Sequence, residues 1–180
     1  MKTTLALLSA TAVLALSGAS LAADETVKGE SKVEYKEDGG YESTRSSKHV
    51  TPEGTTHATE TEVDVDVDSS GRASKTVKTE AVTDPKGLMN KKKDTSKTEI
   101  EEKPRGGYVQ TTLSKHTEAD GTDVTIKTVT DVDVDTSGNI TTTAKSERVV
   151  DPKGWLNETK TTSTTKTVNG RVVEQKKETN

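Results

Sequence analysis

Val and Asp alternate strictly along two stretches of the chain, and this alternation limits the possible folds more than any other feature. The first stretch covers residues 63–68 and the second covers residues 131–135, and each runs into a Ser-Gly turn. Side chains of a β-strand point alternately to opposite faces of the sheet. Each stretch is therefore predicted to be a strand with a valine face and an aspartate face.

Both stretches belong to a duplicated unit with a period of 67 residues. Residues 36–98 align without a gap on residues 103–165, and 31 of these 63 positions are identical. Residues 159–179 repeat only the opening hairpin of the unit. A pattern found in one repeat can therefore be checked at the same position of the other repeat. We assign the repeats to residues 32–98, 99–165 and, for the partial third one, 166–180.

Turn-forming residues divide each repeat into four runs of ten to fourteen residues. The pair Asn169-Gly170 is the strongest short signal of a hairpin. The pattern predicts an all-β fold, an antiparallel meander of about ten strands joined by tight turns. The predicted strands cover residues 27–37, 40–51, 55–68, 72–83, 93–103, 107–118, 122–135, 139–150, 159–168 and 171–179.

Three-residue hairpin loops with a left-handed Gly at the third position predict the register. A slip by one residue would put Val on the charged face, which disfavours other registers. A loop at residues 52–54 would also bring two histidines together. The predicted opposite pairs are Val63–Val77, Val67–Ala73, Val132–Thr142, Val134–Ile140 and His49–His57.

The core available to such a sheet is thin, because Leu, Ile and Val after residue 22 number only 24 and Phe is absent. This composition borders on that of disordered chains, but the strong periodicity favours order. Two sheets could pack as a thin sandwich, or one layer could be held by Thr, Lys and Glu ladders. The more apolar face carries Val63, Val65, Val67, Val124, Ile126, Val132, Val134 and Ile140, diluted with Thr.

In composition and hairpin rhythm, the chain resembles the spirochaete outer surface proteins that contain a free-standing single-layer sheet. The resemblance concerns architecture, and it implies no function.

The first 22 residues predict a secretory signal peptide, followed by a single β domain over residues 23–180. Lys2 precedes an apolar run from Leu5 to Leu16, which is too short to span a membrane, and small residues follow at Ser20 and Ala22. We therefore expect an exported protein, periplasmic or extracellular, without a membrane span. The absence of Cys excludes disulfides, thiol catalysis and Cys metal sites.

The Asp rows are the candidate metal site. Residues 66–71 and 133–138 match the opening of a calcium loop, but position twelve is Val77 or Ala144 instead of Glu. Alternate carboxylates on a flat strand also lie about 6.7 Å apart, which is wide for one ion. The rows are either a solvated face neutralised by Lys and Arg, or a weak calcium site. The candidate ligands are Asp64, Asp66, Asp68, Asp131, Asp133 and Asp135.

Two loops that join the repeats carry large apolar residues, which either cap the sheet or form a small contact patch for another chain. These residues are Leu88, Met89, Trp155 and Leu156.

The function is predicted from the sequence motifs and charge patches that the chain contains and from those that it lacks. No nucleophile motif or phosphate loop is present, and no basic patch suggests nucleic acid. We expect a non-enzymatic structural or interaction protein that self-associates through its sheet edges, near residues 27–37 and 171–179. No cofactor is expected, and the alternative function is weak calcium binding.

Overall fold

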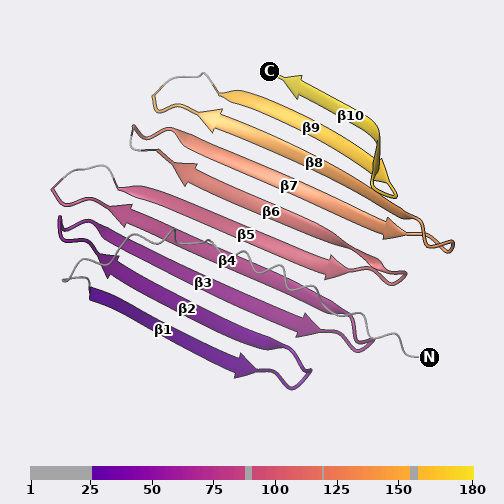
Figure 1. The fold of residues 1–180 in the computed structure, drawn as a ribbon, viewed down its shortest axis with the longest axis horizontal. Coiled ribbons are helices and arrows are strands. Elements are labelled where there is room, and N and C mark those ends of the chain that lie inside the picture. The colour runs from indigo at the N-terminus through magenta and orange to yellow at the C-terminus, as the bar shows by residue number, and fades with distance from the viewer. Residues whose placement is uncertain (1–25, 88–90, 119, 155–157) are drawn as a thin grey trace.

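The computed structural model describes residues 26–87, 91–118, 120–154 and 158–180, and these residues form one open antiparallel sheet of ten strands (Figure 1). Each strand pairs with its neighbours in the sequence, as the meander prediction requires. The predicted signal peptide lies outside the described residues. The strands are β1 (Thr26–Tyr35), β2 (Tyr41–Val50), β3 (Thr56–Val67), β4 (Ala73–Asp84), β5 (Lys92–Glu102), β6 (Gly107–Thr117), β7 (Asp123–Val134), β8 (Ile140–Asp151), β9 (Thr159–Val168) and β10 (Arg171–Thr179).

The predicted strands agree with the observed ones to within two residues at every end. Turn chemistry explains this agreement. In the turn between β3 and β4, the Asp68 N–H donates to the Arg72 carbonyl at 2.9 Å, and the Gly71 N–H donates back to the Asp68 carbonyl at 2.8 Å. Gly71 has φ +81°, a conformation that favours glycine. The same pair of backbone hydrogen bonds, with a positive-φ glycine at the third turn position, occurs in five other turns. Their glycines are Gly39, Gly54, Gly106, Gly121 and Gly138.

The register is also confirmed. All four predicted apolar or uncharged pairs, and the His49–His57 pair, lie directly opposite each other. Following the pairs across the sheet places all eight residues of the predicted apolar face on one side. We call this side, which carries Val63, Val65 and Val67, the valine face, and the side that carries Asp64 and Asp66 the aspartate face.

Very little of the sheet is buried. Among the described residues, Val65 at 6% exposure is the one apolar side chain in the buried class. The valine face is instead crossed by pairs of hydroxyl groups on adjacent strands, at 3.2–3.4 Å. Of the two predicted arrangements, the structure therefore has the single layer and not the sandwich. Its main stabilising element is the backbone hydrogen-bond ladder. The hydroxyl pairs are Thr61–Thr79, Thr98–Thr112, Thr128–Ser146 and Thr161–Thr179.

Both repeats place a second Gly just after the first turn, and close packing explains why. A Cβ atom on Gly40 would lie 2.1 Å from the Val65 carbonyl oxygen, and one on Gly107 would lie 2.1 Å from that of Val132. The hairpin can approach the next strand this closely only without a side chain. These two glycines hold the β1–β2 and β5–β6 turns against β3 and β7.

We predict that Gly40→Ala lowers the free energy of unfolding by about 2 kcal/mol or more, because the backbone must move to relieve the clash. Gly29→Ala is the matched control, since its Cβ would meet nothing closer than the Ser46 carbonyl oxygen at 3.5 Å. Denaturant unfolding of both variants measures the difference. Equal stability of the two variants would contradict this explanation of the Gly-Gly pair.

No helix among the described residues combines the length and apolar character needed to cross a membrane.

Candidate functional site

The structure splits each predicted Asp row into two parts with different partners. Asp64 and Asp66 on β3 bind the Nζ atom of Lys36 at 2.5 Å and 2.6 Å. Lys36 directly precedes the three-residue turn between β1 and β2, and the pairing of β2 with β3 brings that turn beside the aspartates. The Lys36 ammonium group also lies 3.5 Å from Glu42. One lysine is thus shared by three carboxylates and offsets part of their charge.

The second repeat builds the same arrangement. Lys103 forms ion pairs with Asp131 and, at 2.6 Å, with Asp133. Hydrogen bonds to the two aspartates raise the pKa of each lysine, chiefly through Asp64 for Lys36 and Asp131 for Lys103. Each of these two aspartate pairs thus has one lysine as counter-charge. The specific lysines could have been found from the repeat alignment, because both repeats keep Lys before the Gly-containing turn.

The third aspartate of each row stabilises a turn. The Asp68 carboxylate accepts hydrogen bonds from the Ser70 hydroxyl at 2.5 Å, the Arg72 N–H at 3.0 Å and the Arg72 Nε at 2.8 Å. These contacts hold the pKa of Asp68 well below its usual range, with the Ser70 hydroxyl as the largest cause. Asp135 binds the side chain and the N–H of Asn139 at 2.8 Å and 2.9 Å, which lowers its pKa in the same way.

These contacts bear on the calcium alternative without testing it. The described residues contain no group of three or more His, Asp or Glu side chains arranged to hold a metal ion. A calcium ion at Asp64 and Asp66 would have to displace the Lys36 ammonium group, which already lies within 2.6 Å of both. Calcium binding by the six aspartates stays a prediction.

We predict that Lys36→Met destabilises the protein, because Asp64, Asp66 and Glu42 then lose their shared counter-charge. The raised pKa of Lys36 makes its contribution fully present below pH 10.5 and lost as pH rises through the folded-state value. The stability difference from the parent protein should therefore be largest at neutral pH and low salt and shrink above pH 10.5.

Lys103→Met should reproduce this result in the second repeat, and thermal unfolding with and without calcium checks both variants. A lysine variant as stable as its parent at low salt would refute the structural role. Stabilisation by calcium in the variants alone would show that lysine occupies a latent cation site.

The histidines lie on the valine face and differ between the repeats. The rings of His49 and His57 stack with centroids 6.0 Å apart, and the His57 Nδ1 lies 3.2 Å from the Thr83 hydroxyl. In the second repeat, His116 contacts Asp94 through Nδ1 and Glu118 through Nε2, the latter at 3.1 Å. The contact with Asp94, followed by that with Glu118, raises the pKa of His116.

We predict that His116 stabilises the β5–β6 pair in acid. Because its folded-state pKa is raised, its contribution is fully present below pH 6.5 and is lost as pH rises through the folded-state value. His116→Gln should therefore cost more stability at pH 5.5 than at pH 8.5, as measured by denaturant unfolding. A stability loss independent of pH would contradict the charged contact.

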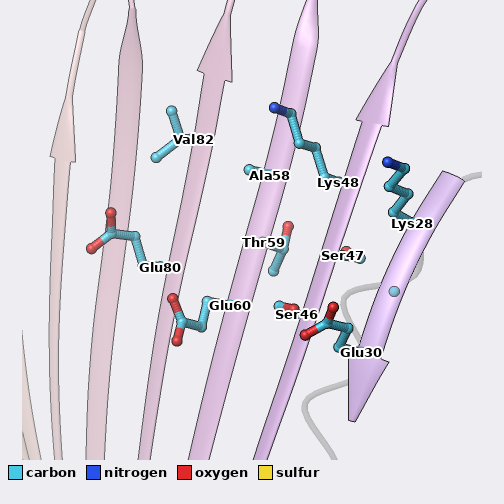
Figure 2. Close-up of a pocket in the computed structure, with 11 residues that line it drawn as sticks. Lys28, Glu30, Ser46, Ser47, Lys48, Ala58, Thr59, Glu60, Glu80 and Val82 are labelled. Carbon is cyan, nitrogen blue, oxygen red and sulfur yellow. The ribbon is translucent and has the colours of Figure 1, made fainter. Parts of the chain in front are cut away.

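A shallow hollow on the aspartate face crosses β1 to β4 (Figure 2). The small side chains of Ser46 and Ala58 form its floor, and longer charged side chains surround them. Figure 2 shows Lys28 and Lys48 together at one end, and the register places them directly opposite each other. Because its floor is one layer of strand, the hollow leaves a bound small molecule exposed on one side. Glu30, Glu60 and Glu80 lie at the other end.

The predicted contact patch of Leu88, Met89, Trp155 and Leu156 lies outside the described residues.

The two edges of the sheet are its most accessible hydrogen-bonding surfaces. Within the described residues, β1 pairs with β2 alone and β10 pairs with β9 alone. Every residue of β10 is exposed, as are residues 28–35 of β1. Each edge strand therefore presents a row of backbone N–H and C=O groups toward solvent.

Comparisons with protein-family models, with curated proteins and with solved structures find no match to this chain. The resemblance to spirochaete outer surface proteins thus rests on composition and hairpin rhythm.

Proposed function

We propose that this protein is an exported, non-enzymatic structural protein of the periplasm or extracellular matrix that self-associates through the open edges of its sheet. The observation that supports this proposal is the pair of exposed edge strands, β1 and β10, each paired on one side within the described residues. An unpaired edge is a template for a strand of another molecule. Export is inferred from the signal-peptide pattern of residues 1–22.

Strand direction favours association of β10 with β1. Nine successive antiparallel pairings leave β1 and β10 running in opposite directions (Figure 1). A second molecule can therefore add its β1 to β10 and continue the antiparallel order without rotation of the sheet. Such a contact joins two different surfaces, so it produces a filament unless it closes into a ring.

A structural role also fits the distribution of surface chemistry. The aspartate face is a network of exposed ion pairs, such as Lys78–Glu62 at 3.0 Å and Lys160–Glu147 at 2.8 Å. Its hollow is shallow, and the valine face carries hydroxyl rows. No specific observation favours the calcium alternative over this proposal.

We predict that assemblies lengthen across the strands. Ten strands spaced about 4.8 Å apart add about 48 Å per molecule along the assembly axis. Electron microscopy and small-angle scattering at rising protein concentration should show elongated particles, and sedimentation should show less association at high salt.

Stacking of two valine faces is the competing arrangement, and it would thicken the particle by about 10 Å without lengthening it. Compact two-layer dimers, or a monomer at every concentration and salt, would overturn the proposed function.

A further inference from the structure

The two edge strands carry complementary charge patterns on the aspartate face. Along β1 the charges alternate in sign and begin with the positive Lys28. Along β10 the charges also alternate, and they end with the negative Glu178. On β1 these residues are Lys28, Glu30, Lys32 and Glu34, and on β10 they are Arg171, Glu174, Lys176 and Glu178.

The sheet itself leaves most of these charges without an opposite charge across the strand. Lys28 lies opposite Lys48, and Glu34 lies opposite Glu42, so two of the pairs on β1 are like-charged. Such pairs are destabilising in a sheet. Glu30 and Lys32 lie opposite Ser46 and Thr44, and Lys176 and Glu178 lie opposite Thr164 and Thr162.

The charges instead pair along their own strands, where they are exposed. Lys32 contacts Glu34 at 2.5 Å, and Lys176 contacts Glu178 at 2.6 Å. The four side chains are 58–72% exposed, so they can turn toward a new strand at little cost. Among the β10 charges, Glu174 has a lysine opposite it, Lys166 on β9.

We infer that β10 of one molecule pairs with β1 of a second copy in one antiparallel register. This inference rests on the proposed self-association and specifies its contact. The register places Lys28 opposite Glu178, Glu30 opposite Lys176 and Lys32 opposite Glu174, and it keeps the aspartate faces of both molecules on one side. Each of the three pairs joins opposite charges.

The same register overlaps the two strands along nearly their whole length, with residues 27–34 facing residues 171–179. β10 contains a bulge between Val172 and Glu174 in its pairing with β9. A new strand that follows this bulge as β9 does brings Val33 opposite Val172 and Glu34 opposite Arg171. Val33 and Val172 are 52% and 61% exposed in the single molecule, so the contact covers two apolar side chains on the valine face.

Neighbouring registers are disfavoured by the same charges. A shift of two residues in one direction places Lys28 opposite Lys176 and Glu30 opposite Glu174. A shift of two in the other direction places Glu30 opposite Glu178 and Lys32 opposite Lys176. A shift of one residue puts the valine face of one molecule beside the aspartate face of the other. Alternating charge thus disfavours the registers shifted by one or two residues. A shift of four residues restores opposite charges, with Lys32 opposite Glu178, but it shortens the overlap of the two strands.

A symmetric contact between two β1 strands is the main rival, because Lys28–Glu34 and Glu30–Lys32 pairs would form there too. That contact leaves both β10 strands of the dimer open. The β10–β1 contact uses both edges of every molecule and leaves open edges only at the ends of the assembly.

Charge reversal separates the two contacts. Glu30→Lys and Lys176→Glu should each weaken association about three- to tenfold, because each creates a like-charge pair. An equimolar mixture of the two variants should recover parental association. In the mixture, the reversed β1 edge of one variant faces the reversed β10 edge of the other, and the two unchanged edges form the parental pair. Glu101→Lys is the control, because it makes the same charge change on β5, an inner strand.

The Cys-free chain also allows the register to be trapped. Ser31→Cys and Gln175→Cys in one chain place directly opposite residues of the valine face within disulfide range, about 4.5–5.5 Å between Cα atoms. Ser31→Cys with Lys177→Cys is the matched control, since diagonal Cα atoms lie about 7–8 Å apart. Mild oxidation should give a ladder of covalent oligomers for the first variant and mostly monomers for the second.

The outcomes distinguish the register from the proposed function. Parental protein that never associates overturns both. Association that Lys176→Glu leaves unchanged and Glu30→Lys weakens, without recovery in the mixture, identifies the β1–β1 contact and overturns the register alone. Association unaffected by either reversal places the contact away from the edges and overturns both. Recovery in the mixture, together with a covalent ladder that forms with Ser31→Cys and Gln175→Cys but not with the control pair, supports the inference.

Discussion

The backbone hydrogen-bond ladder between neighbouring strands is the interaction on which this structure depends. A sheet with Val65 as its one buried apolar side chain among the described residues cannot be held by a hydrophobic core. Each added strand instead satisfies a row of N–H and C=O groups left open by the previous one. This requires short turns that reverse the chain without a register error, and the glycine-terminated three-residue turns meet that need in both repeats.

Side-chain contacts on the two faces of the sheet add to the stability that the ladder provides. Hydroxyl pairs cross the valine face, while ion pairs cross the aspartate face, where Lys36 and Lys103 each bind two aspartates. Some inner charges find partners on neighbouring strands, such as Lys78 with Glu62 and Lys160 with Glu147. At β1 and β10, the same alternating pattern has an open side, so the interaction that assembles the sheet within one molecule is also available between molecules.

Most of the fold could be predicted because its determinants are local. Period-two alternation identified the strands, and the left-handed glycine at the third turn position fixed pairs such as Val63–Val77. The Lys36 contact could not be predicted in the same way, since it depends on where a turn lies beside a strand two steps along the sheet. In the Asp-x-Ser-Gly segment that matches the opening of a calcium loop, Asp68 accepts a hydrogen bond from the Ser70 hydroxyl and so stabilises the turn. Calcium binding there stays a prediction. Leu88, Met89, Trp155 and Leu156 lie outside the described residues, so their role stays a prediction.

Hydrogen exchange resolved to single amides tests the central claim, that the ladder ends at two open edges and continues into the next molecule. In dilute monomer, inner strands should be protected, while alternate amides of β1 and β10 exchange rapidly. At concentrations where the protein associates, those edge amides should become protected and the inner strands should not change. Protection of both edges in the monomer, or unprotected edges in the assembly, would contradict the account.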